Sequence, residues 1–204
     1  MTDFEQYTDG DEVESEMPGS LRNQFLVATP NLDAGIFKSS VTYVCEHNAE
    51  GAMGIIVNRP STMHVEDILA DVAELEVSEV ENKTPVLVGG PVGLERGFVL
   101  HKREKGESRW SSSLQVTSDI LLTGSRDILL AMSEGKGPKN YLVVLGYAGW
   151  GAGQLEQELA ENAWLTVPAC SEILFSTPFY KRADAAIAEL GIDLASLATI
   201  PGNA

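Results

Sequence analysis

The sequence predicts a single α+β domain, and three observations support this. Short β-rich runs and amphipathic helical segments interleave along the chain without an internal repeat. Two neighbouring β-rich runs are separated by a short polar loop that contains glycine, which is the spacing of an antiparallel hairpin. The chain has 204 residues, of which 44% are hydrophobic, enough for one core that needs neither disulfides nor a metal. Hairpins favour α+β over a doubly wound sheet.

The first part of the chain contains this hairpin, whose loop is 48–51. Pro30 follows the first predicted strand, and Pro60, which has no amide donor, ends the third. Apolar residues at helical spacing come next, and Ser61 or Thr62 is the predicted N-cap. The predicted elements are strands at 21–28, 41–47 and 52–58 and a helix at 64–74.

The second part alternates strands and helices. The run 141–145 is continuously apolar, which is typical of a strand covered on both faces. The glycine-rich segment 146–153 is predicted to be a close turn into the next helix. An anion site there is the alternative, but its spacing matches neither the dinucleotide nor the P-loop fingerprint. The predicted strands are 85–88, 98–101, 114–117, 141–145 and 164–167, and the predicted helices are 125–132, 154–162, a turn near 173 and 181–190.

The charge distribution argues against nucleic acid and anionic membrane as partners. The formal net charge is −16, from 14 basic and 30 acidic residues. Residues 1–16 hold seven acids and no base, so the remainder carries 14 bases against 23 acids, a net charge of −9. Such an excess repels phosphates at long range. We expect residues 1–18 to be a disordered acidic tail and 19–204 to be the folded domain.

The cysteines and the N-terminus predict a cytoplasmic protein with reduced thiols. Cys45 and Cys170 lie 125 residues apart and form no Cys-x-x-Cys pair. The chain begins with acidic residues instead of a secretory signal, and no stretch approaches the ~20 apolar residues of a membrane span. The three histidines follow no metal-ligand spacing, so neither a metal nor a cofactor is expected.

The sequence allows two interpretations of Cys45. Alternation along a strand places Cys45 and His47 on one face, about 7 Å apart. The simpler interpretation is a packed, inert thiol, and the alternative is a reactive thiol assisted by His47 or His101. Gly89-Gly90, after a strand, either shapes a turn or leaves open backbone beside a ligand.

Six segments, in this order and spacing, resemble the YqgE/AlgH family. They are 37–41 (FKSSV), 45–48 (CEHN), 50–60 (EGAMGIIVNRP), 89–92 (GGPV), 97–101 (GFVLH) and 146–156 (GYAGWGAGQLE). The resemblance covers nearly everything after the acidic tail. It implies a mixed β-sheet curled into a pseudo-barrel with flanking helices, in the bacterial cytosol. It implies no reaction, because the family has no established activity.

These observations favour a non-enzymatic binding or regulatory protein that acts through a protein partner or a small ligand. The alternative is a thiol-dependent enzyme or redox-responsive protein that uses Cys45. A transcriptional regulator, a label carried by some family members, is the remote alternative, because the sequence has no helix-turn-helix pattern. The candidate binding or reactive residues are Cys45, His47, Asn58, Arg59, Gly89, Gly90 and His101.

Overall fold

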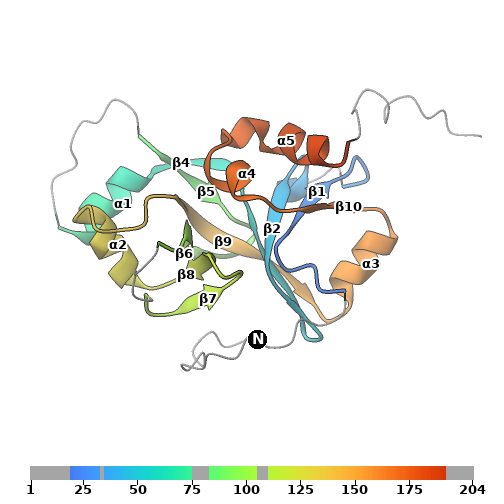
Figure 1. Cartoon of the computed structure of the whole chain (residues 1–204), viewed down its shortest axis with the longest axis horizontal. Helices are drawn as coiled ribbons and strands as arrows, with labels where there is room; N and C mark the ends of the chain where they lie inside the picture. The colour runs from blue at the N-terminus through green and yellow to red at the C-terminus, as the bar shows by residue number, and fades with distance from the viewer. Residues whose placement is uncertain (1–18, 33–34, 75–82, 105–109, 192–204) are drawn as a thin grey trace, which may run out of the picture.

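A computed structural model describes residues 19–32, 35–74, 83–104 and 110–191 (Figure 1). The acidic tail predicted at 1–18 lies outside these residues. Within them the chain folds as one α+β domain in which a single curled sheet is flanked by helices. None of the described helices is long and apolar enough to span a bilayer.

Ten strands form the sheet, and their order confirms the predicted mixed topology. The main path runs β10-β1-β2-β3-β9-β6-β8-β7 with antiparallel neighbours. β5 pairs with β9 in parallel, and β4 pairs with β5 antiparallel. The strands are β1 (Gln24–Ala28), β2 (Val41–Asn48), β3 (Gly51–Ile56), β4 (Pro60–His64), β5 (Pro85–Val88), β6 (Val92–Lys102), β7 (Ser113–Gln115), β8 (Ile120–Thr123), β9 (Tyr141–Gly151) and β10 (Trp164–Pro168).

β9 connects the two halves of the sheet. Its first part pairs with β5 and β6, and its last part, from Ala148 onward, pairs with β3. Between them Gly146 has φ +70°, which bends the strand from one half toward the other. The prediction of a strand at 141–145 is therefore confirmed, but the turn predicted at 146–153 is wrong for most of its length. The strand runs on to Gly151, and only Ala152 and Gly153 lead into the next helix.

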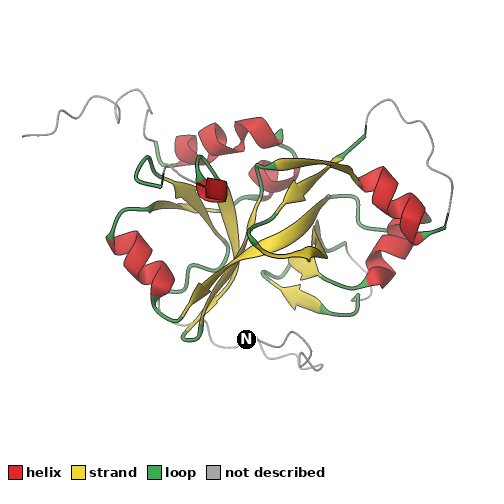
Figure 2. Cartoon of the chain, turned by 180° about the vertical axis from the view of Figure 1, so that it is seen from behind, coloured by secondary structure: helices red, strands yellow, loops and turns green. Residues whose placement is uncertain are grey.

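The helices flank the curled sheet (Figure 2). They are α1 (Val65–Val72), α2 (Arg126–Ser133), α3 (Gln154–Ala160), α4 (Ser171–Phe175) and α5 (Arg182–Glu189), with 3-10 turns at Gly35–Phe37 and Phe179–Lys181. α1 and α2 pack together at one end of the molecule, and α3 lies at the other. α4 and α5 lie across the sheet between them.

The apolar residues separate into three clusters that follow this arrangement. The largest joins residues of both halves of the sheet with α4 and α5 residues such as Ile173 and Ile187. A second, around Trp150 and Trp164, lies under α3. A third, which includes Val99 and Val143, lies under α1 and α2. Val143 and its neighbour Val144 belong to different clusters, so β9 is covered on both faces as predicted.

Two local predictions were wrong for identifiable reasons. β3 ends at Ile56 and Pro60 begins β4, so Pro60 does not mark the end of β3, and Ser61 and Thr62 lie in a strand and cannot cap α1. His64 occupies the N-cap position of α1 and makes no side-chain capping bond there. The hairpin of β2 and β3 and the helices α1, α2, α3 and α5 are confirmed within a few residues.

Candidate functional site

Cys45 and His47 do not share a face of β2, contrary to the sequence prediction. A β-bulge between Val44 and Glu46 shifts the register against β3, so that the alternation of side chains changes after Cys45. Cys45 packs with Tyr43 in the main cluster. His47 pairs across the strands with Ala52, which belongs to the cluster under α3. The bulge therefore separates the thiol from the imidazole expected to activate it.

The Cys45 thiol is in an environment that opposes ionisation. Its residue has 0% exposure, and its Sγ lies 3.7 Å from the carbonyl oxygen of Tyr43. Burial, followed by the negative charge of Glu46, raises the pKa of the Cys45 thiol far above its ordinary value. A nucleophilic cysteine requires the opposite, an accessible thiol with a lowered pKa. The geometry thus favours the packed reading of Cys45.

This environment predicts slow alkylation of Cys45. In a Cys170→Ser variant, which removes the half-buried second thiol, Cys45 should react with iodoacetamide at least about a hundredfold more slowly than free cysteine, because reaction requires opening of the core. Mass spectrometry of quenched samples gives the rate. Alkylation faster than that of free cysteine, slowed by His47→Ala, would revive the thiol hypothesis.

His47 connects three segments of the chain. The backbone N–H of Leu21 donates to its Nδ1 at 2.9 Å, so the neutral ring carries its hydrogen on Nε2. Nε2 lies 2.8 Å from Oε1 of Glu156 on α3 and donates to it in that tautomer. Ser20 Oγ donates to the His47 carbonyl at 3.2 Å. The side chain is buried, and both ring nitrogens have partners within the chain, which is a structural role.

His101 belongs to a buried hydrogen-bond chain whose direction is fixed. Ser113 Oγ donates to the carbonyl of Trp110 at 2.8 Å. The Thr123 hydroxyl, 2.7 Å away, must therefore donate to Ser113 Oγ. Thr123 Oγ1 then accepts from Nε2 of His101 at 2.9 Å. With Nε2 acting as a donor, His101 cannot take a proton from Thr123 as a general base would.

Asn58 and Arg59 hold a loop in place. Asn58 Oδ1 accepts from the Val41 amide at 2.9 Å, and Asn58 Nδ2 donates to the Ser39 carbonyl at 2.9 Å. Arg59 Nη2 donates to the Lys38 carbonyl at 2.8 Å. These bonds link two of the sequence segments that carry the family resemblance. Both side chains thus fix the entry into β2.

Gly89 and Gly90 lie where two backbones touch. A Cβ on Gly89 would lie 2.3 Å from the Gly146 carbonyl oxygen, and one on Gly90 would lie 2.1 Å from the carbonyl carbon of Tyr147. The Gly89 amide donates to the Leu145 carbonyl at 2.8 Å. This contact explains the glycines without a ligand.

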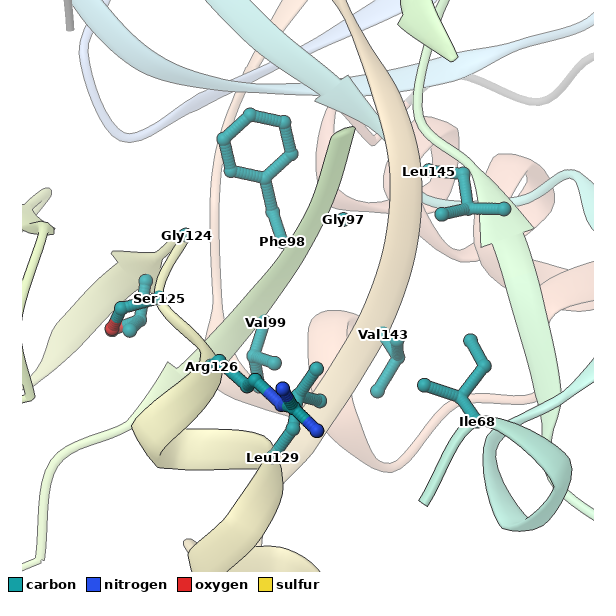
Figure 3. A pocket seen from close by; sticks show the side chains of 11 residues that line it. Ile68, Gly97, Phe98, Val99, Gly124, Ser125, Arg126, Leu129, Val143 and Leu145 are labelled. Atoms are coloured by element: carbon teal, nitrogen blue, oxygen red, sulfur yellow. The ribbon is translucent and has the colours of Figure 1, made fainter. Parts of the chain in front are cut away.

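A cavity that none of the candidate residues lines lies between the helices α1 and α2 and the strands β6, β8 and β9 (Figure 3). Its volume is about 220 Å³. It is mainly apolar and is lined by Ile68, Gly97, Phe98, Val99, Thr123, Gly124, Ser125, Arg126, Leu129, Val143 and Leu145. Two glycines on the wall leave space where side chains would otherwise stand.

Arg126 is the charged residue of this lining. Its side chain extends from the start of α2 across the cavity toward Ile68 on α1 (Figure 3). Its Nη2 donates to the carbonyl of Val72, the last residue of α1, at 2.9 Å. The residue is exposed, so Arg126 forms a solvent-accessible part of the lining, which we call the rim. The cavity thus combines an apolar interior with a cationic rim.

Sequence reasoning missed this cavity because its lining residues come from five separate elements and the loop before α2. The available signal was a pair of isolated glycines, Gly97 and Gly124, each beside a strand with large apolar residues. Within the described part of the chain, no group of three His, Cys, Asp or Glu side chains is placed to hold a metal. The described geometry forms a mainly apolar cavity and leaves the seven predicted residues in structural contacts elsewhere.

Comparison with known proteins agrees with the family resemblance that the sequence segments indicated. The AlgH-like family of domains (DUF179) matches residues 25–195. A UPF0301 protein of Hahella chejuensis is 48% identical over 93% of this chain and 100% of its own, and one of Nitrosococcus oceani is 49% identical over 90% and 96%.

Solved structures show the same fold. The AlgH protein from Pseudomonas aeruginosa, also a UPF0301 protein, superposes with a TM-score of 0.74 at 41% identity, covering 94% of this chain and 100% of that one. A protein from Corynebacterium diphtheriae has the same fold with a TM-score of 0.66 at 18% identity, covering 88% and 91%. The predicted curled sheet with flanking helices is thereby confirmed, and the chain belongs to the AlgH-like family.

Proposed function

We propose that this protein is a non-enzymatic binding protein of the bacterial cytosol, which takes a small, mainly apolar molecule into the cavity between α1, α2 and the sheet. The observation that carries the proposal is the cavity itself. Ligand sites are concave, mostly apolar and provided with a few polar groups at defined places. This cavity has that composition, with Ser125 and Arg126 as polar lining residues.

The size of the cavity limits the ligand. A volume of about 220 Å³ is below the roughly 300–1,000 Å³ of pockets for drug-sized ligands. A molecule with a short alkyl chain or one small ring fits this size, whereas a nucleotide or a folded peptide segment does not. Burial of such a chain gives a modest affinity, with a Kd on the order of 1 mM for a six-carbon alcohol.

The surroundings of the candidate reactive residues give this proposal further support. Cys45 is buried and His101 donates from Nε2 to Thr123, and neither residue lines the cavity, so neither presents a reactive group to it. Thr123, which does line the cavity, has its hydroxyl hydrogen bound to Ser113. Binding without chemistry is the simplest use of such a lining.

Filling the cavity from its glycine wall should abolish binding. A Cβ on Gly97 would meet only Leu145 Cδ2, at 3.8 Å, so Gly97→Leu fits the backbone and places its side chain beside another lining residue. We expect 1-hexanol to shift the amide signals of Gly97, Gly124 and Ser125 in ¹H–¹⁵N spectra of the unaltered protein. The same titration should leave the spectrum of Gly97→Leu unchanged.

Gly151→Leu is the matched control. A Cβ at Gly151 meets only Gln154 Oε1, at 3.9 Å, and this strand end does not line the cavity. It should bind 1-hexanol as the unaltered protein does. Equal binding by both leucine variants, or the absence of shifts at these amides in the unaltered protein, would reject the proposed site.

A further inference from the structure

The charge at the rim of the cavity specifies the ligand more closely than its volume does. Resting on the proposed function, we propose that the cavity selects a small amphipathic carboxylate, with its apolar body inside and its carboxylate bound by Arg126. Arg126 lines the cavity and is exposed to solvent. Its planar guanidinium has five N–H donors in the geometry that matches a carboxylate.

The Arg126 guanidinium retains donors for a ligand. One hydrogen bond, from Nη2 to the Val72 carbonyl, ties it to the end of α1. Among the residues that the structure describes, no Asp or Glu forms an ion pair with it. The bond to Val72 fixes the direction of the side chain, and it leaves the positive charge without a carboxylate partner in this part of the chain.

The neighbouring acid, Asp127, does not form an ion pair with Arg126, because its oxygens accept hydrogen bonds from other groups. Asp127 Oδ2 accepts from the Ser111 amide at 3.0 Å. Asp127 Oδ1 accepts from the Ile128 amide at 2.9 Å and from the hydroxyl of Ser125. These bonds point the carboxylate of Asp127 toward the loop before β7 and the first turn of α2, whereas the side chain of Arg126 crosses toward α1 (Figure 3).

The overall charge of the chain makes Arg126, which has no carboxylate partner among the described residues, informative about the ligand. The chain carries 30 acidic and 14 basic residues, so most of its surface disfavours anions. An arginine beside an apolar cavity reverses this preference locally. A neutral alcohol of the same length would gain only the apolar contacts, and an amine would be repelled. Arg126 therefore discriminates between ligands by their head groups, while the cavity accepts the same alkyl chain in each.

Three six-carbon probes test the inference at neutral pH. Hexanoate, 1-hexanol and hexylamine share an alkyl chain and differ in charge, and ¹H–¹⁵N titrations give the Kd of each. We expect hexanoate to bind about tenfold more tightly than 1-hexanol, since a charge-assisted hydrogen bond is the stronger kind. Hexylamine should bind more weakly than 1-hexanol.

Substitution of Arg126 distinguishes the contribution of the carboxylate to the affinity from that of the alkyl chain. Arg126→Gln should weaken hexanoate to the level of 1-hexanol and leave 1-hexanol unchanged, and Arg126→Lys should keep part of the preference. Arg96→Gln, an exposed arginine that does not line the cavity, should change neither Kd. The inference is overturned if hexanoate binds no better than 1-hexanol, or if hexanoate still binds more tightly than 1-hexanol to Arg126→Gln. In both cases, binding of 1-hexanol at the cavity amides would still uphold the proposed function. Absence of binding by all three probes would reject both.

Discussion

Replacing Gly90 with alanine is expected to lower the free energy of unfolding by at least about 3 kcal/mol, which is in the range of severe single substitutions. A Cβ on Gly90 would lie 2.1 Å from the carbonyl carbon of Tyr147, 2.2 Å from its oxygen and 2.3 Å from the nitrogen of Ala148. All three are backbone atoms, so no rotamer change can relieve the clash. The strand β9 or the segment after β5 has to move.

That movement would break a connected set of hydrogen bonds. The carbonyl of Gly89 accepts from the Ile56 amide at 2.7 Å, and the Gly89 amide donates to Leu145 at 2.8 Å. A Cβ added to the opposing Gly146 would lie 2.8 Å from the Gly90 carbonyl oxygen, so neither backbone segment has room for a side chain at this contact. Separating these backbones therefore disturbs the connection of β3, β5 and β9. Each lost bond in a buried place costs about 1–3 kcal/mol.

Gly97→Ala is the control, because it makes the same chemical change where there is room. The nearest atom to its Cβ is Leu145 Cδ2 at 3.8 Å. Its stability should stay the same or rise by up to about 1 kcal/mol, since alanine restricts the unfolded chain. Urea unfolding followed by circular dichroism measures both variants. If Gly90→Ala is as stable as Gly97→Ala, the backbone contact does not constrain the fold.

The sequence predicted those parts of the fold that depend on local pattern. The hairpin of β2 and β3 follows from two β-rich runs and a glycine-containing loop, and α2 follows from Ser125 and Asp127 at its start and from the glycines after it. The curl of the sheet came from the family resemblance. It depends on the bend of β9 at Gly146, whose conformation becomes evident only beside Gly90.

The candidate site was less predictable, because it depends on long-range contacts. Strand alternation placed Cys45 and His47 together, and one extra residue at the bulge separated them. The cavity is formed by α1, α2 and three strands that are far apart in sequence, so no local pattern indicates it. Arg126 was not among the residues predicted from the sequence, and its place in the lining depends on the packing of α2 against α1 and the sheet.

Arg182→Met is expected to lower the free energy of unfolding by about 2–4 kcal/mol. Arg182, the first residue of α5, is only 5% exposed. Its Nη1 donates to the carbonyl of the fully buried Val57, just after β3, and its Nε donates to the carbonyl of Thr177 at 3.0 Å. The side chain thus joins the C-terminal helix to the sheet.

The expected loss comes from the carbonyls that Arg182 satisfies. Burial lowers the pKa of the Arg182 guanidinium to about 10, so it remains charged at neutral pH. Its desolvation already costs stability, and its two hydrogen bonds offset that cost. Methionine occupies a similar volume without a donor and leaves the Val57 carbonyl buried and unpaired, which is more costly than the absence of both partners.

Lys181→Met distinguishes this mechanism from a general effect of losing a positive charge. Lys181 precedes Arg182 and is exposed, so its replacement should change stability by less than about 0.5 kcal/mol. Arg182→Lys, which keeps the charge but cannot reach both carbonyls with one ammonium group, should lie between the two. Urea unfolding of the three variants at pH 7 gives the comparison. Equal stability of Arg182→Met and Lys181→Met would show that the bonds to Val57 and Thr177 do not hold α5 on the sheet, whereas a large loss confined to the Arg182 variants would show that they do.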